Sequence, residues 1–175
     1  MDKNNLFKNV KTLTFISSES CNLNCKYCEI AKDATLSHAQ ETIKVKESLS
    51  NGTFLTNCEK IFYDYNIDPL QIDTFDLWGQ EPTLTLDALA TQMPQLLNWF
   101  KNCKVIFFST NGMAYPERIV TFIKTINDYL TMTNTERELH LEIQFSVDGI
   151  GKDIEPRGAD ADIIKQNIIS ILHSL

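Results

Sequence analysis

The sequence predicts an α/β fold made of four successive strand–helix units that share one parallel sheet. Two observations support this prediction: β-branched or aromatic runs alternate with stretches of helical apolar spacing, and no repeat or linker divides the 175 residues. Hydrophobic residues make up 43% of the chain, which is enough to bury a core. We therefore expect a single domain over residues 1–175, with right-handed crossovers between the strands.

The first two predicted strands lie in the first half of the chain. Residues 11–17 (KTLTFIS) are β-branched and aromatic, and they lead directly into a group of cysteines. Helices are expected over residues 37–49 and near residues 58–65. The second strand is expected over residues 73–78 (DTFDLW), where Gly79 closes it.

The third unit is the most apolar. A helix is expected from Leu86, and Pro94 predicts a kink or a break within it. Residues 104–110 (KVIFFST) are apolar on both faces, which is typical of a strand covered from both sides. The next helix is expected to start near Pro116, because proline suits the first helical turn.

The fourth unit shows the clearest strand pattern. Residues 139–147 alternate strictly between apolar and polar side chains, so one face is expected to be buried. Glu142 and Gln144 lie on the polar face, which is either solvated or lines an active cavity. A final amphipathic helix is expected from about Asp160, with Asp160 or Asp162 as its N-terminal cap.

Unusual residues follow each of the four predicted strands. They are the stretch Cys21–Cys28, the run Gly79-Gln80-Glu81-Pro82, the pair Asn111-Gly112 and the pair Asp148-Gly149. The carboxyl ends of parallel strands lie at one edge of a sheet, where loops carry most of the chemistry of such folds. The sequence therefore predicts a functional site at this edge.

Charge and the N-terminal sequence limit the expected partners and location. The chain has 16 Lys and Arg against 23 Asp and Glu, a net charge of −7, so non-specific nucleic-acid binding is not expected. The first residues, MDKNNLFKNVKTLTF, lack the apolar core of a signal peptide, and no run approaches 18 apolar residues. We expect a soluble, cytoplasmic protein without membrane contact.

Three of the five cysteines, Cys21, Cys25 and Cys28, fall within eight residues. Structural zinc usually takes four ligands in two separated pairs, whereas iron–sulfur clusters are held by closely spaced thiolates. Cys58 and Cys103 remain, but Cys103 precedes a predicted strand and belongs to the opposite end of the sheet. A 4Fe–4S cluster with three cysteine ligands is favoured. A zinc knuckle or a chance grouping is the alternative.

The motifs resemble those of radical S-adenosylmethionine (SAM) enzymes. The run CNLNCKYC resembles the cysteine signature of that family, LWGQEPTL resembles its Gly-Gly-Glu-Pro motif, and STNG and SVDG resemble its next two strand ends. The resemblance extends from Leu13 to the end of the chain. In style, the motifs are most similar to those of maturases that modify peptides or proteins.

This resemblance implies a partial TIM-like barrel of about four strands, with helices on the outside and without the last barrel strands. It also implies a 4Fe–4S cluster that reductively cleaves SAM to a 5′-deoxyadenosyl radical, which abstracts hydrogen from a substrate such as a peptide or protein. Flavodoxin or ferredoxin would donate the electron, and self-association or a partner would complete the barrel. The alternative is a non-catalytic metal-binding or SAM-binding module, such as a truncated family member.

The resemblance also implies site residues. Cys21, Cys25 and Cys28 would ligate the cluster, and the backbone of Tyr27 would lie against the adenine. Other positions match contacts to the rest of SAM: Gly79, Gln80 and Glu81 to its amino group, Ser146 to its carboxylate or ribose, and Arg157 to its carboxylate.

Ser109, Asn111 and Asp148 are further SAM-binding candidates, by their location at strand ends. Gln80 departs from the family pattern, because a second glycine usually stands there. Glutamine would cost strain only at a positive φ, and we expect no such strain. Trp78 either shapes the SAM pocket or is a buried strand residue.

Overall fold

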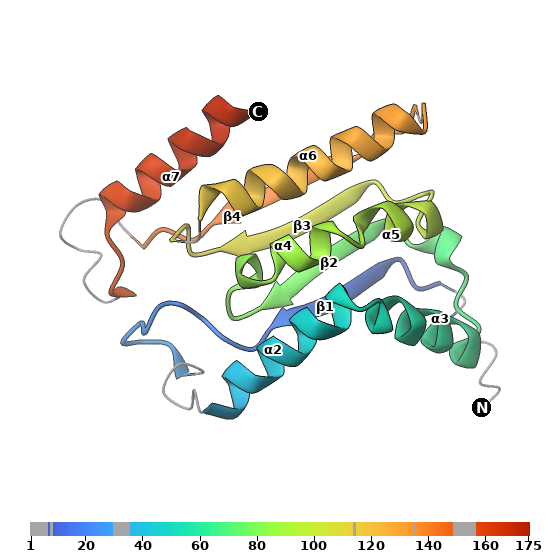
Figure 1. Ribbon diagram of the computed structural model, residues 1–175, viewed down its shortest axis with the longest axis horizontal. Helices are drawn as coiled ribbons and strands as arrows, with labels where there is room; N and C mark the ends of the chain where they lie inside the picture. The colour runs from blue at the N-terminus through green and yellow to red at the C-terminus, as the bar shows by residue number, and fades with distance from the viewer. Residues whose placement is uncertain (1–6, 8, 30–35, 114, 135, 149–156) are drawn as a thin grey trace.

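The parallel sheet contains four strands in the order in which they occur along the chain (Figure 1). The computed structural model describes residues 7, 9–29, 36–113, 115–134, 136–148 and 157–175. Within these residues the strands are β1 (Thr12–Ser18), β2 (Thr74–Gly79), β3 (Val105–Thr110) and β4 (His140–Phe145). Every adjacent pair is parallel, which confirms the predicted class of fold.

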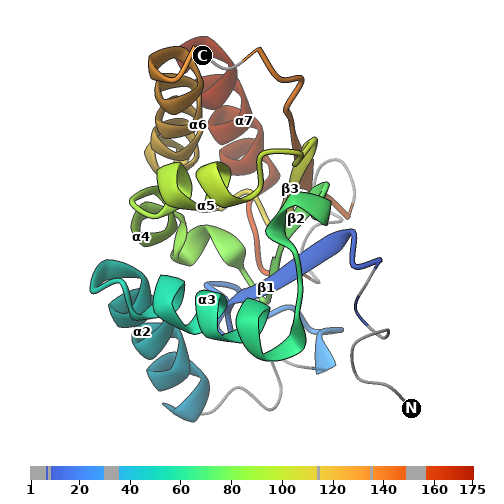
Figure 2. The ribbon, with the colours of Figure 1, turned by 90° about the vertical axis from the view of Figure 1, so that its right-hand side faces the viewer.

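The helices lie together on one side of the sheet (Figure 2). They are α2 (Leu36–Ser50), α3 (Thr53–Tyr65), α4 (Leu86–Ala90), α5 (Met93–Trp99), α6 (Pro116–Met132) and α7 (Ala161–Ser174), with short 3₁₀ turns η2 (Pro69–Gln71) and η3 (Pro82–Leu84). A sheet whose strand order never reverses, with its helices on one face, has the arrangement of a partial TIM-like barrel. No helix of the described ranges is long and apolar enough to cross a membrane.

The core lies between the sheet and this helical layer. Phe75 and Phe108 alternate with open-face residues along their strands and are almost fully buried. Their rings contact those of helical or helix-flanking phenylalanines, with centroid separations of 5.9 Å from Phe75 to Phe100 and 6.1 Å from Phe108 to Phe122. Phe107 points to the other face and is only partly buried. The expectation that this strand is covered from both sides is therefore wrong, because helices cover one face.

Pro94 marks a real interruption, as predicted. Helix α4 ends at Ala90, and α5 begins at Met93 with Pro94 in its first turn. A proline in the first turn has no helical hydrogen bond to lose, so the break places it where it is tolerated.

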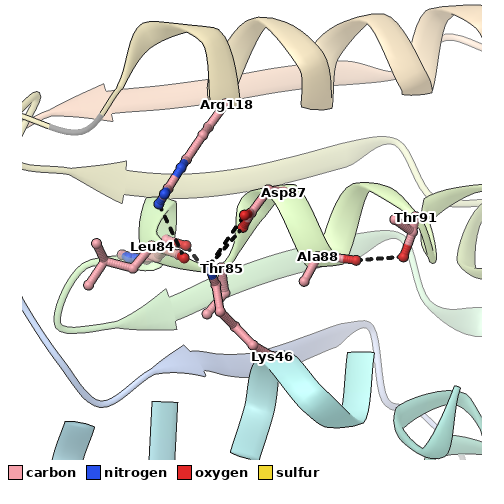
Figure 3. Close-up of polar contacts among 8 residues, drawn as sticks. Lys46, Leu84, Thr85, Asp87, Ala88, Thr91 and Arg118 are labelled. Atoms are coloured by element: carbon pink, nitrogen blue, oxygen red, sulfur yellow. Dashed lines mark hydrogen bonds and ion pairs between the residues drawn. The ribbon is translucent and has the colours of Figure 1, made fainter. Parts of the chain in front are cut away.

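Helix α4 links the neighbouring units of the helical layer (Figure 3). Lys46 of α2 forms an ion pair with Asp87 of α4, at 3.3 Å between Nζ and Oδ1. Arg118 of α6 donates from Nη1 to the carbonyl of Leu84, at 3.4 Å. An exposed ion pair such as Lys46–Asp87 contributes little stability by itself. Together the two contacts tie α2 and α6 to the turn that follows β2.

Candidate functional site

The carboxyl ends of the strands meet at the left of Figure 1, where the residues after each strand contact those of its neighbours. The backbone N–H of Gln80 donates to the carbonyl of Ser18 at 3.0 Å, which joins the ends of β2 and β1. The N–H of Ser146 donates to the carbonyl of Thr110 at 2.8 Å, which joins β4 to β3. The strand ends therefore form a continuous edge, as the sequence predicted.

Gly79 is required by the close approach of β1 and β2. Its φ is +141°, and a Cβ added there would lie 2.3 Å from the carbonyl oxygen of Ser18. Gln80, in contrast, is not at a positive φ, since Asn66 and Asn134 are the non-glycine residues with positive φ in the described ranges. Glutamine at this position therefore causes no backbone strain of the left-handed kind, as expected from the sequence.

The Glu81 carboxylate is buried between the ends of β2 and β3, with its residue 1% exposed. Its Oε1 accepts from the hydroxyl and backbone N–H of Thr83 and, at 2.8 Å, from the hydroxyl of Thr110. Its Oε2 accepts from the backbone N–H of Asn111, also at 2.8 Å. Four donors on one buried carboxylate make Glu81 an internal anchor, a role that the sequence reasoning missed. Its contact to SAM stays a prediction.

Asn111 continues this network into the cysteine loop, which we define as residues 21–28. The side chain is almost buried, and its Oδ1 accepts from the N–H of Met113 at 2.9 Å. Its Nδ2 donates to Oδ1 of Asn22 at 2.7 Å and to Sγ of Cys21 at 3.4 Å. The N–H of Leu23 also donates to Cys21 Sγ, at 3.4 Å. The end of β3 and the cysteine loop are therefore directly bonded.

The thiols of the cysteine loop are partly buried at Cys21, Cys25 and Cys28. A turn closes the loop, with the N–H of Cys28 donating to the carbonyl of Cys25 at 3.0 Å. Burial raises the pKa of the Cys21 thiol and the negative charge of Glu81 adds to this, against the hydrogen bonds from Leu23 and Asn111. A bound cation would offset this preference for the neutral thiol.

The donor set of the cysteine loop fits an iron–sulfur cluster. Among the residues that the structure describes, no three Cys, His, Asp or Glu side chains gather as ligands of one metal ion. A four-iron cluster does not require this convergence, because each thiolate binds a different iron. Cys103 lies before β3, at the far end of the sheet, and burial raises the pKa of Cys58 to about 11. Cys21, Cys25 and Cys28 would be the three residues that hold such a cluster, and one iron would then have no protein ligand among the described cysteines.

A second network joins the cysteine loop to the residues that follow β4. The Arg157 guanidinium donates to both oxygens of Asp148, at 2.9 Å from Nε to Oδ2 and 2.9 Å from Nη2 to Oδ1. The Tyr27 hydroxyl donates to Oδ2 of the same carboxylate. Such a bidentate pair is the strong form of a charged hydrogen bond. The bond from Tyr27 to this pair holds the cysteine loop against the residues that follow β4.

The network of Asp148, Arg157 and Tyr27 also sets the protonation of Asp148 and Tyr27. The bonds from Arg157 and Tyr27 hold the pKa of the Asp148 carboxyl below its usual range. Partial desolvation, together with the bond to Asp148, raises the pKa of Tyr27 to about 12. At neutral pH this network therefore contains the neutral phenol of Tyr27, the carboxylate of Asp148 and the guanidinium of Arg157.

Two predicted positions lie apart from these networks. Ser109 is partly buried on the open face of β3, in register with Gln144 of β4. Trp78 is 56% exposed on the open face of the sheet, beside its register partner Ile16. The alternative of a buried strand tryptophan is therefore wrong. Sequence reasoning also missed Asn22, since nothing local to it signals a partner 89 residues away.

These observations define a class: an α/β protein with an all-parallel sheet and a cysteine-containing site at the carboxyl edge of its strands. No family model matches the chain, and neither a curated protein nor a solved structure does.

Proposed function

We propose that this chain is a radical SAM protein, which binds a 4Fe–4S cluster and SAM at the carboxyl edge of its sheet. The observation that carries the proposal is the cysteine loop, which contacts the buried Glu81–Asn111 network through Cys21 and the Asp148–Arg157 pair through Tyr27. When bound, the cluster would supply one electron that cleaves SAM to a 5′-deoxyadenosyl radical for hydrogen abstraction from a substrate. Peptides or proteins are the substrate class that the motif style favours.

Arg157 is suited to bind the SAM carboxylate while it remains paired with Asp148. The pair uses the Nε and Nη2 atoms of the guanidinium, so Nη1 has no partner among the described residues and would serve a second anion. The side chain of Arg157 is 11% exposed, which limits competition from water. Asp148 would then orient the guanidinium rather than contact SAM.

The backbone at Gly79 and Gln80 is the better candidate for the SAM amino group. The carboxylate of Glu81 already accepts four hydrogen bonds in a buried position, whereas Gly79 and Gln80 are only partly buried. A backbone carbonyl accepts from an ammonium group without the cost of desolvating a further charge. Glu81 would therefore hold the strand ends in place around SAM.

The open face of the sheet is where we place the substrate. It carries the exposed side chains of Ile16 and Trp78 and the polar side chains of Glu142 and Gln144. In a barrel this face would be the interior. Association through the outer edge of β4, with a second copy or another protein, would enclose it. The electron for the cluster would come from an external donor such as flavodoxin or ferredoxin, in a reducing cytoplasm.

Anaerobic reconstitution with iron and sulfide tests this function. We expect a brown protein with about four irons per chain. Reduced with dithionite and given SAM, it should release 5′-deoxyadenosine, which chromatography quantifies. A colourless protein that retains one zinc ion and leaves SAM intact would instead support the non-catalytic metal-binding module.

Arg157→Ala should weaken SAM binding to the reconstituted protein about ten- to a hundredfold. The reason is the loss of a charge-assisted bond to the carboxylate, worth about 1.5–3 kcal/mol. Anaerobic titration calorimetry gives the affinity. Lys165→Ala is the matched control, because it removes one positive charge from an exposed position on α7. Equal affinities for the two variants would exclude Arg157 from the SAM site.

A further inference from the structure

We infer that Asn111 donates a hydrogen bond to the Cys21 sulfur that raises the reduction potential of the cluster, an inference that rests on the proposed function. The role differs from a contact to SAM, because it acts through a cluster ligand. Asn111 is thus a positioning residue. Its amide N–H lies next to the Cys21 sulfur, which would share the electron that is added when the cluster is reduced.

The orientation of the Asn111 amide is fixed by three partners. Its oxygen accepts from the N–H of Met113 at 2.9 Å, so the NH₂ group must face the cysteine loop. One N–H is directed at Asn22 Oδ1, 2.7 Å from Nδ2, and the other at Cys21 Sγ, 3.4 Å away. Reversing the amide would break all three bonds. The assignment of the donor therefore follows from the network.

The position of the donor is fixed as strongly as its orientation. The backbone N–H of Asn111 donates to the buried carboxylate of Glu81, and the side chain is only 7% exposed. The other donor to Cys21, the N–H of Leu23, belongs to the cysteine loop and moves with it. Asn111 directly follows β3 and is 90 residues away from Cys21, so its donor group is held against the sulfur by contacts outside the cysteine loop.

The effect on the cluster follows from the charge that reduction adds. One electron enters from the reductant, no bond forms or breaks, and part of the added negative charge resides on the thiolate sulfurs. A donor N–H directed at such a sulfur stabilises the more negative state, so the potential rises. A carboxylate in the same place repels the added charge and should lower the potential further than simple loss of the amide.

A redox titration followed by electron paramagnetic resonance tests the inference on reconstituted wild type, Asn111→Ala and Asn111→Asp. At a fixed solution potential, we expect the reduced-to-oxidised ratio of Asn111→Ala to be about tenfold lower, or about 59 mV for one electron. The isosteric Asn111→Asp should shift it further in the same direction. Asn167→Ala is the control, because its Nδ2 bonds the adjacent carbonyl of Gly112 at 2.8 Å rather than a sulfur.

SAM affinity, measured on the same samples, separates this role from a SAM contact. We expect Asn111→Ala to bind SAM as tightly as Asn167→Ala does. Unchanged potentials in both Asn111 variants, with the cluster loaded, would overturn the inference and leave the proposed function standing. A wild-type protein that takes up no four-iron cluster would overturn both.

Discussion

Alanine at Cys21, Cys25 or Cys28 should abolish uptake of the four-iron cluster. Each substitution leaves two thiolates, and closely spaced thiolates are the protein ligands of the proposed cluster. Iron and sulfide analysis after anaerobic reconstitution measures the effect, and visible absorbance gives an independent reading. We expect little or no bound iron in all three variants.

The controls are the two cysteines outside the cysteine loop. Cys58 lies in α3, where burial raises its pKa to about 11, and Cys103 is 2% exposed before β3. Cys58→Ala and Cys103→Ala should load iron like the wild type, although loss of the buried Cys103 side chain should cost some stability. Full iron content in any variant of the cysteine loop would refute the cluster assignment.

Glu81→Ala should destabilise the fold even without any cluster. The backbone N–H groups of Thr83 and Asn111 would lose their buried acceptor and could not reorient, whereas the two threonine hydroxyls could rotate. At roughly 1–3 kcal/mol for each unsatisfied group, the free energy of unfolding should fall by about 2–6 kcal/mol. Urea denaturation of the apo-protein, followed by circular dichroism, measures it.

Glu142→Ala is the matched control for this experiment. Glu142 lies on the exposed face of β4, and its substitution should change stability by no more than about 0.5 kcal/mol. Glu81→Gln should be intermediate, since one acceptor oxygen remains. If Glu81→Ala unfolds at the same urea concentration as Glu142→Ala, the carboxylate does not anchor the strand ends.

The fold was predictable because its signals are local. Pro94 marks the end of one helical segment and the start of another, and the alternation over residues 139–147 matches the strand His140–Phe145. The sequence did not show, in contrast, that helices cover only one face of β3. Phe107 is as apolar as its neighbours, and only the strand order places it on the face without helices.

The gathering of these residues at one edge of the sheet was predictable, but the contacts between their side chains were not. The sequence places Asp148 just after the fourth strand and Arg157 nine residues further on, but it does not show that the two side chains form a bidentate bond. The contact from Asn111 to Cys21 likewise depends on the registers of three strands. Two side chains that are 90 residues apart in the sequence form no local spacing pattern from which their contact could be predicted.

The bond between Tyr27 and Asp148 has a consequence for how the protein is made. The two residues are 121 positions apart, so the ribosome completes the cysteine loop long before it adds the carboxylate that holds it. At about 5–20 residues per second, the interval is roughly 6–24 seconds. During synthesis the thiols of the cysteine loop therefore emerge before Asp148 and before Asn111, whose side-chain amide bonds Cys21 in the folded protein. If the proposed function holds, the cysteine loop would reach the geometry described above only after the fourth strand has left the ribosome.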